Sequence, residues 1–387
     1  MRSAELFSGC GGLALGLARA GFKHELVVER DPQSIETLQE NKRQKVSHVR
    51  YWPISAIDTR DIDFGDHRGI DLIAGGPPCQ PFSIGGRHLG PQDSRNMWPE
   101  AVRAVRQIRP KAFIFENVRG LLRPAFAKYL EYTTLQLAYP DIERRHGETW
   151  KTHLARLRQH AGSKRGRPAD YRVLVRGINT ADYGAAQKRH RAIIVGIASK
   201  FGDEWEIPAP THSDEALAWT KYVECDYWDR HETRRLTEPS SAHEEQALRR
   251  ALDRKKSPSE KPWVTVRDAL NDLPSPKKNA AIQGHWQHHG ARAYRNHTGS
   301  CIDEPAKALK AGDHGVPGGE NMLVNSRGNV RYFTIREMAR LQGFPDDFII
   351  SGSWKAATRQ LGNAVPVQVG EKIGKEIIRL LKAKSEK

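Results

Sequence analysis

Short apolar runs alternate with segments of helical periodicity along the first half of the chain. Runs that predict buried strands lie at residues 3–7, 25–29, 71–74, 112–115, 171–176 and 192–197. Apolar positions spaced three or four residues apart predict helices at residues 13–20, 33–41 and 98–108. This alternation of strands and helices favours an α/β fold built on a sheet of mainly parallel strands.

The pattern weakens after about residue 201 and returns near the end of the chain. Thr334 is followed by Glu337 three residues later, which predicts a capped helix over 334–342, and residues 367–382 predict an amphipathic helix. We therefore expect one domain formed by residues 1–200 and 335–387, and a smaller domain formed by residues 201–334.

The smaller domain is rich in tryptophan, histidine and arginine. Interleaved aromatic and basic side chains suit the grooves of DNA, although a tryptophan is as often a core residue. A glycine-rich stretch at 312–320 excludes regular structure and suits a backbone that must approach a partner closely. The tryptophans in question are Trp205, Trp219, Trp228, Trp263 and Trp286.

The 387 residues carry a formal net charge of +16, which favours a polyanionic partner such as nucleic acid over a merely basic soluble protein. No apolar stretch reaches the roughly 18 residues of a membrane span, and the N-terminus lacks a secretory signal, so we expect a cytoplasmic protein. The four cysteines form no C-x-x-C pair, so neither a metal site nor a disulfide framework is indicated.

A basic segment at residues 144–168 has two interpretations. Arg156, Arg158 and the run 163–168 can belong to a solvated helix followed by a loop. Alternatively, they form an arm that binds phosphate groups.

A glycine turn joins the first predicted strand to the first predicted helix. It runs from Phe7 to Gly12, and Glu29 ends the next strand about twenty residues later. Glycines allow a close approach of the backbone to a ligand, and a carboxylate there can accept both ribose hydroxyls. The pattern fits a dinucleotide or S-adenosylmethionine equally, and it also fits a structural turn beside a surface acid.

Cys79 lies in a proline-braced loop directly after the strand at 71–74. In the sequence Gly-Gly-Pro-Pro-Cys-Gln-Pro the prolines restrict the backbone, and Gln80 adds a polar group. Ligands bind at the carboxyl edge of such sheets, which favours a functional thiol over a packing cysteine. Glu116 ends the strand at 112–115 and is expected at the same edge, where it could donate a proton to a ring nitrogen.

Two arginines, Arg189 and Arg191, are two positions apart. On an extended segment such residues point to the same face, where they would suit an anion or a carbonyl oxygen near the nucleophile.

Taken together and in order, these motifs resemble the cytosine-5 DNA methyltransferases over nearly the whole chain. The matching segments are residues 7–12, Glu29, Asp58, 78–80, 116–118, 187–191, 336–342 and 362–366.

The resemblance implies a Rossmann-like methyltransferase sheet with helices on both faces, plus a smaller target-recognition domain. It implies transfer of a methyl group from S-adenosyl-L-methionine to C5 of a cytosine flipped out of double-stranded DNA, with no metal. We expect a monomer of the prokaryotic cytosol and nucleoid. It would be either an orphan methylase or one paired with a restriction endonuclease that acts separately.

By the same resemblance, the thiolate of Cys79 would add to C6 while Glu116 protonates N3. Arg191 would hold the cytosine O2, Arg189 would brace the loop or a phosphate, and Asn117 and Gln80 would support the Cys79 loop.

The implied cofactor site places Glu29 on the ribose, Asp58 on the adenine amino group and Trp98 against the adenine, and it brings in Asn363 from the C-terminal segment. Arg30 departs from the aromatic residue that some members carry, Ala186 from a common proline and Ala308 from a common hydroxyl residue. The expected cofactor residues are Phe7, Gly9, Cys10, Gly11, Gly12, Glu29, Arg30, Asp58, Pro78, Trp98, Asn363 and Ala364.

Three other functions remain open. Family members that act on transfer RNA share the Pro-Cys-Gln and Glu-Asn-Val motifs, although their Cys-Phe-Thr signature has no counterpart here. An inactive DNA-binding relative would be expected to lose Cys79, Glu116 or the glycine turn, and all three are present. A nicotinamide oxidoreductase would explain the glycine turn and Glu29 but not the other motifs.

Overall fold

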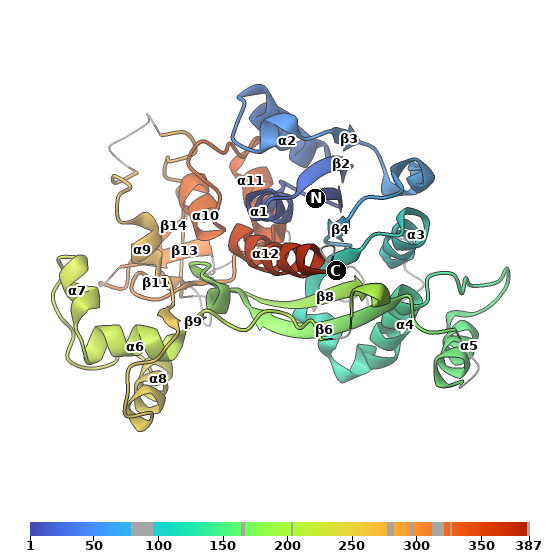
Figure 1. Ribbon diagram of the computed structural model, residues 1–387. Coiled ribbons are helices and arrows are strands. Elements are labelled where there is room, and N and C mark those ends of the chain that lie inside the picture. Colours follow the sequence, from blue (N-terminus) through green and yellow to red (C-terminus); the bar gives the residue numbers. More distant parts are fainter. Residues whose placement is uncertain are drawn as a thin grey trace. The chain divides into compact units, whose positions relative to one another are not determined.

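The computed structural model consists of two compact units (Figure 1). Unit 1 comprises residues 1–178, 190–208 and 370–387, and unit 2 comprises residues 179–189 and 209–369. The boundaries differ from those of the expected domains, since residues 179–189 and 335–369 belong to unit 2 and residues 201–208 belong to unit 1. The described residues are 1–78, 96–163, 167–202, 204–276, 282–293, 298–311, 321–325 and 327–384.

Unit 1 is built on a seven-stranded sheet with the order β3-β2-β1-β4-β5-β8-β6. Five adjacent strands pair parallel with one another, namely β3, β2, β1, β4 and β5, whereas β8 pairs antiparallel with β5. The largely parallel sheet that the sequence predicts is therefore confirmed. The strands are β1 (Arg2–Leu6), β2 (Lys23–Glu29), β3 (Ile54–Ala56), β4 (Leu72–Gly75), β5 (Ala112–Val118), β6 (Tyr171–Asn179) and β8 (His190–Ala198).

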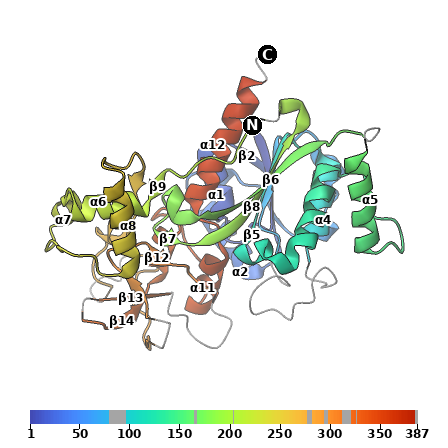
Figure 2. The same cartoon turned by 90° about the horizontal axis from the view of Figure 1, so that it is seen from below.

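Helices cover both faces of this sheet, with α1 and α12 on one side and α4 on the other (Figure 2). Glycines allow α12 to approach α1: a Cβ on Gly370 would stand 2.9 Å from the Leu13 carbonyl oxygen, and one on Gly374 would stand 2.8 Å from Ala20 Cβ. The helices are α1 (Gly12–Ala20), α2 (Pro32–Arg43), α3 (Trp98–Ile108), α4 (Ala127–Ala138), α5 (Trp150–Gly162) and α12 (Val367–Ala383).

Unit 2 contains six helices and several short strands among its described residues. They are α6 (Asp214–Tyr222), α7 (Asp226–Arg230), α8 (Ala242–Asp253), α9 (Val266–Leu270), α10 (Ile335–Leu341), α11 (Trp354–Asn363), β7 (Gln187–Lys188), β9 (His212–Ser213), β10 (Lys261–Pro262), β11 (Ser300–Cys301), β12 (Ala306–Lys307), β13 (Met322–Val324) and β14 (Val330–Tyr332). α10 begins with the expected capping box of Thr334 and Glu337. Trp228 and Trp263 pack in a buried cluster, whereas Trp286 is 54% exposed.

An acidic side chain is buried in β1, the first strand of the unit 1 sheet. Glu5 in β1 is 1% exposed, and its Oε2 has no hydrogen-bond partner. Its pKa is well above the ordinary value of about 4.5, because burial disfavours the charged carboxylate. An acidic residue within an apolar run is only a weak signal of this burial in the sequence.

This burial predicts a pH-dependent stability. The folded state retains the Glu5 proton at a pH where the unfolded chain has released it, so the free energy of unfolding falls as the pH rises above about 4.5. The isosteric Glu5→Gln variant has no carboxyl proton to retain. Relative to the wild type, its free energy of unfolding therefore rises by up to ~1.4 kcal/mol per pH unit. Urea unfolding at pH 5 and pH 8 measures the difference.

The control is Glu25→Gln in the neighbouring strand β2, where the side chain is 35% exposed and paired with Arg2. This variant gains no stability with rising pH relative to the wild type. A Glu5→Gln difference that is the same at both pH values would contradict the assignment.

Candidate active site

The glycine turn after β1 has an unusual backbone. Phe7, Gly9 and Gly11 all have positive φ, at 56°, 55° and 88°, and a left-handed phenylalanine is rare. A Cβ on Gly11 would stand 2.9 Å from the ring of Trp52, so only glycine fits there. Backbone strain of this kind is typical of a functional turn.

Glu29 is fixed beside this turn by main-chain donors. Its Oε2 accepts a hydrogen bond from the Gly9 N–H at 2.6 Å, and its Oε1 accepts from the N–H groups of Arg30 and Asp31 at 2.8 Å each. Apart from Gly9 and its two chain neighbours, no described residue has an atom within 4 Å of the place where a Cβ on Gly9 would stand. An open backbone beside an oriented carboxylate fits the ribose and the adjoining part of a nucleoside cofactor.

Cys10 and Gly12 are both buried within the same turn. Burial raises the pKa of the Cys10 thiol to about 12, so the group stays protonated and packs in the core. Gly12 is the first residue of α1. These two residues can contribute to the shape of a ligand site through their backbone.

Asp58, which follows β3, is surrounded by two arginines. Arg60 donates to it from its backbone N–H and from two side-chain nitrogens, and Arg30 donates from Nη1 at 2.8 Å. The hydrogen bonds from the Arg60 side chain, together with those from Arg30, hold the Asp58 pKa far below its usual range. Neither arginine contact was expected from the sequence.

Glu116 and Arg191 form an ion pair at the end of β5. Their Oε1 and Nε atoms are 2.5 Å apart, and the side chains are 9% and 14% exposed. The antiparallel register of β5 with β8 places Val118 opposite Arg191, which brings the two charges to one edge. The geometry joins a carboxyl group and a fixed cation, as a site for a polar ring would require.

The strand that leads to Cys79 ends beside this pair. A Cβ on Gly76 would stand 3.4 Å from Glu116 Oε2, and Asn117 Nδ2 donates to the Pro77 carbonyl at 3.0 Å. Pro78 is half-buried. Cys79 and Gln80 themselves lie outside the described residues, so the contacts found here concern the start of their loop.

Arg189 has a different environment from Arg191. It is 1% exposed, and it donates to the Leu309 carbonyl at 2.8 Å and to the Gly362 carbonyl at 2.5 Å, all within unit 2. A break between β7 and β8 separates the two arginines, so they do not belong to one extended strand. Of the two roles expected for Arg189, these contacts fit the brace.

The remaining expected cofactor residues are in different settings. Trp98 begins α3 and is 1% exposed, with its ring edge-on to Phe115 and its Nε1 without a hydrogen-bond partner. Asn363, the last residue of α11, is exposed, and Ala364 is buried. Both belong to unit 2, and their part in a cofactor site stays a prediction.

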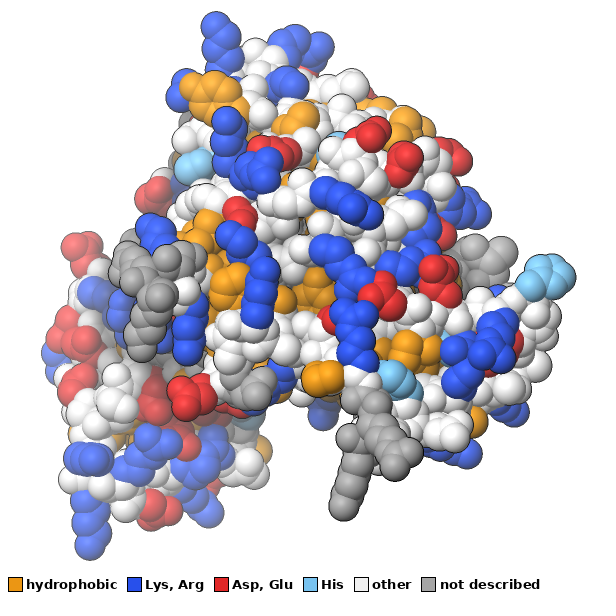
Figure 3. Space-filling model, turned by 45° about the vertical axis from the view of Figure 1, so that its right-hand side comes forward, with side chains coloured by type: hydrophobic (Ala, Val, Ile, Leu, Met, Phe, Trp, Pro, Cys, Tyr) orange, Lys and Arg blue, Asp and Glu red, His pale blue; other side chains and the backbone are white. Residues whose placement is uncertain are grey.

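Three arginines of the basic segment near α5 form ion pairs. Arg156 pairs with Glu148, Arg158 with Glu131, and Arg167 with Asp141 and Asp170. These contacts favour the solvated helix over the phosphate-binding arm, although residues 164–166 lie outside the described part. Lys and Arg side chains are spread over the face in Figure 3, with acidic side chains among them.

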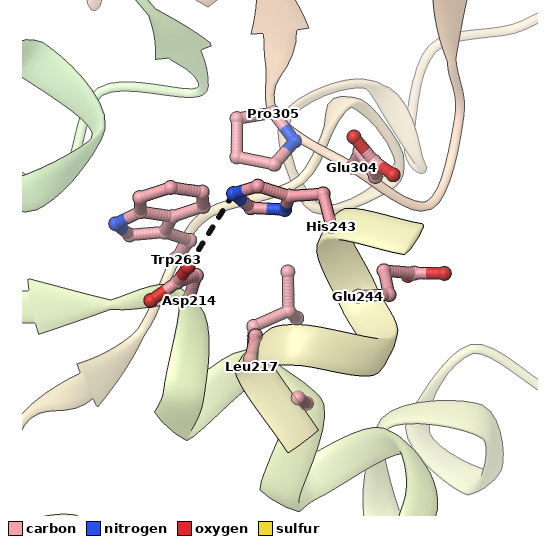
Figure 4. Close-up of a pocket in the computed structure, with 9 residues that line it drawn as sticks. Asp214, Leu217, His243, Glu244, Trp263, Glu304 and Pro305 are labelled. Carbon is pink, nitrogen blue, oxygen red and sulfur yellow. Dashed lines mark ion pairs between the residues drawn. The ribbon is translucent and has the colours of Figure 1, made fainter. Parts of the chain in front are cut away.

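Unit 2 contains a small pocket between α6 and α8 (Figure 4). The rings of His243 and Trp263 stack at 5.9 Å, and His243 Nε2 is 3.4 Å from Asp214 Oδ2. The volume of this pocket, about 10 Å³, is enough for one water molecule at most. It is therefore not a ligand site.

The described residues lack two further features. They include no cluster of three or more His, Cys, Asp or Glu side chains arranged to hold a metal ion. None of their helices combines the length and the apolar character required to cross a membrane.

Known proteins resemble this chain over almost its full length. The type II methyltransferase M.NgoMIV of Neisseria gonorrhoeae is 29% identical over 384 residues, covering 98% of this chain and 98% of that protein. M.PspPI of Psychrobacter sp. is 31% identical over 384 residues, covering 98% of this chain and 79% of that protein.

Two solved structures share the fold. One is a DNA modification methyltransferase encoded within an E. coli prophage, with a TM-score of 0.58 and 22% identity over 99% of both chains. The other is the Dnmt2 methyltransferase of S. pombe, with a TM-score of 0.56 and 17% identity over 98% of this chain and 99% of that one. The methyltransferase fold expected from the motifs is confirmed.

The sequence also matches the family described as C-5 cytosine-specific DNA methylase, over residues 1–139 and 143–379. The chain therefore belongs to the C-5 cytosine-specific DNA methylase family and is an S-adenosylmethionine-dependent DNA (cytosine-5) methyltransferase.

Proposed function

We propose that this enzyme methylates C5 of a cytosine flipped out of a specific duplex DNA sequence, through a covalent adduct with Cys79. The observation that carries the proposal is the Glu116–Arg191 pair beside Gly76, three residues before Cys79. A nucleophile, a proton donor and a fixed cation would then share one edge of the sheet.

In the first step the Cys79 thiolate forms a bond to C6 of the cytosine. The electron pair of the C5–C6 double bond then moves toward C4 and N3. Glu116, in its protonated form, donates a proton to N3, which neutralises the negative charge that the addition places on the ring. Arg191 holds the Glu116 carboxyl group and the O2 of the cytosine. The expected brace from Asn117 to the start of the loop agrees with its hydrogen bond to Pro77.

S-adenosyl-L-methionine, when bound, supplies the electrophilic methyl group. The enamine-like C5 would take this group, which leaves S-adenosyl-L-homocysteine, and N3 would return its proton to Glu116. The C5 proton would then pass to water while the Cys79 thiolate leaves and the C5–C6 double bond is restored. Glu29 and the open backbone at Gly9 would hold the ribose and its neighbouring atoms. Asp58 and Arg30 would lie at the adenine end.

We also propose a role of the enzyme in DNA modification, since relatives that match nearly the whole chain are named type II methyltransferases. A restriction endonuclease acting separately would be the matching partner. We propose a monomer with the target-recognition function in residues 201–334.

The substrate can be tested with the methyl-labelled cofactor. We expect label on duplex DNA and none on transfer RNA when each is incubated with the purified enzyme. Bisulfite sequencing of host DNA after expression then gives the target sequence and the modified cytosine. Label on transfer RNA alone would exclude the DNA reaction proposed here.

The covalent adduct with Cys79 can be tested by trapping it. In the presence of S-adenosyl-L-methionine, duplex DNA containing 5-fluorocytosine at the target position traps the enzyme after methyl transfer, because fluorine at C5 cannot leave as a cation. The expected result is a complex that survives denaturing electrophoresis for the wild type and not for Cys79→Ser. Cys225→Ser, which changes a half-buried cysteine of unit 2, is the control and still forms the complex. Turnover by Cys79→Ser would contradict the mechanism.

The Glu116–Arg191 pair makes a third prediction. Glu116→Gln removes the proton donor at nearly constant shape, and we expect kcat to fall by roughly 10²–10⁴. Arg191→Lys keeps a charge but not the guanidinium geometry, and we expect a loss of about 10². Binding of S-adenosyl-L-homocysteine, measured by calorimetry, stays unchanged in both variants.

Glu131→Gln is the matched control for these two variants. Glu131 also pairs with an arginine, Arg158, but it is 39% exposed and lies on α4. Its kcat remains at the wild-type level. A Glu116→Gln enzyme with wild-type kcat would rule out the assigned proton transfer.

A further inference from the structure

Two exposed arginines follow directly after β5, the strand that carries Glu116. The chain continues from β5 into a short 3₁₀ helix, η5 (Arg119–Leu122). Arg119 begins this helix, Arg123 follows it, and both residues are exposed. In the register of β5 with β8, Arg191 lies opposite the last residue of β5. Arg119 therefore comes one residue after the edge at which Glu116 and Arg191 meet.

The backbone between the two arginines is held in place by packing. Leu121 is 1% exposed. Leu122 lies against β6, where a Cβ on Gly177 would stand 3.0 Å from the Leu122 Cδ1 atom. The Arg123 N–H donates to the Gly120 carbonyl at 3.1 Å, which closes the turn. The turn is thus fixed on unit 1 while the arginines that flank it stay exposed.

No described side chain compensates the charges of these two arginines. Among the described residues, no carboxylate forms an ion pair or a hydrogen bond with Arg119 or Arg123. The sequence contains no acidic residue between Glu116 and Glu131, and both of these acids pair with other arginines. This setting differs from that of the arginines near α5, which have acidic partners.

A histidine at the same edge is affected by this positive charge. His190 is the first residue of β8. Its pKa lies below the usual value of about 6.5, first because its ring is partly removed from water and then because the charges of Arg119 and Arg191 repel a proton. The excess of positive charge is therefore local to the edge that bears Glu116, where it favours an anion.

A flipped cytosine would bring anions to this edge. Its base is joined through the deoxyribose to a phosphodiester group on each side, and every such group carries a negative charge. A base held by Glu116 and Arg191 would place these groups near the residues that follow β5. Arginine binds phosphate through parallel N–H donors, and contacts with phosphates fix the position of a protein on the duplex.

We propose that Arg119 and Arg123 each bind a phosphate of the DNA backbone beside the flipped cytosine, and so hold the target strand at the edge that bears Glu116. This inference rests on the DNA reaction proposed above. Neither arginine was among the site residues expected from the sequence.

The salt dependence of DNA binding tests these charge contacts. The probe is a duplex that contains the target sequence, and fluorescence anisotropy measures its affinity for the full-length enzyme. Each phosphate contact adds about 0.9 to the slope of log affinity against log salt. We expect Arg119→Gln and Arg123→Gln each to lower the slope by about 0.9 and to weaken binding about fivefold at about 0.15 M salt. Arg119→Lys, which keeps the charge, retains the wild-type slope, and an unchanged slope in Arg119→Gln would contradict the proposal.

Arg68→Gln is the matched control for the loss of one positive charge. Arg68 is exposed and has no ion-pair partner among the described residues. It precedes β4, which runs parallel to β5, so it lies at the opposite edge of the sheet. The slope and the affinity of this variant stay at the wild-type values. A loss equal to that of Arg119→Gln would show a general effect of net charge and would overturn the assignment.

Neutral methylphosphonates at single positions of the duplex locate the contacts. For the wild type we expect the replacement of either phosphate adjacent to the target cytosine to weaken binding about fivefold. One of these replacements causes no further loss in Arg119→Gln, and the other causes none in Arg123→Gln, because the contact is already absent. Losses that add at both positions would show that the arginines do not bind these phosphates.

Calorimetry with S-adenosyl-L-homocysteine separates a phosphate contact from a contact with the carboxylate of the cofactor. We expect Arg119→Gln and Arg123→Gln to bind this compound as the wild type does. A loss of about tenfold in either variant would assign that arginine to the cofactor and would overturn the proposal. Thermal unfolding confirms that each variant is folded.

Methyl transfer by the wild type distinguishes a failure of this inference from a failure of the proposed function. If the wild type labels duplex DNA and neither arginine is coupled to a phosphate beside the cytosine, the DNA reaction stands and the phosphate contacts are wrong. If the wild type labels no DNA, the proposed function is wrong and this inference fails with it.

Discussion

The antiparallel pairing of β8 with β5 is the constraint on which the proposed catalytic arrangement depends. A parallel strand would bring its last residues to the edge where Glu116 lies, whereas β8 brings its first residues there. Arg191 consequently meets Glu116 at 2.5 Å without a long loop. Both side chains are largely buried, so each charge compensates the other, and the loss of one would leave an unpaired buried charge.

Much of unit 1 could be predicted from periodicity, because its strands are continuous apolar runs and its helices have one apolar face. α3 has the expected bounds, and α10 has the expected capping box. β3 was missed because three residues carry no measurable pattern, and α4 because its aromatic residues gave no clear apolar face. The tryptophans of unit 2 could not be divided into core and surface, since burial depends on contacts distant in sequence.

The site was predicted in part, where local motifs specify it. The sequence indicated Glu29 beside the glycine turn and Glu116 at a strand end, and both are found there. It did not reveal that Arg189 binds the Leu309 and Gly362 carbonyls, because those partners are more than 100 residues away. Spacing of two residues predicted a shared face, but a break in the strand between Lys188 and His190 removes the periodicity on which that prediction depended.

Glu29 and Asp58 are oriented by different means. This difference determines how sequence change affects each of these two residues of the proposed cofactor site. Glu29 is held by three backbone N–H groups, which remain when the neighbouring side chains change. Asp58 is held mainly by the side chains of Arg30 and Arg60, each of which a single substitution removes. Sequence change at position 30 therefore alters the surroundings of Asp58, whereas those of Glu29 keep their geometry.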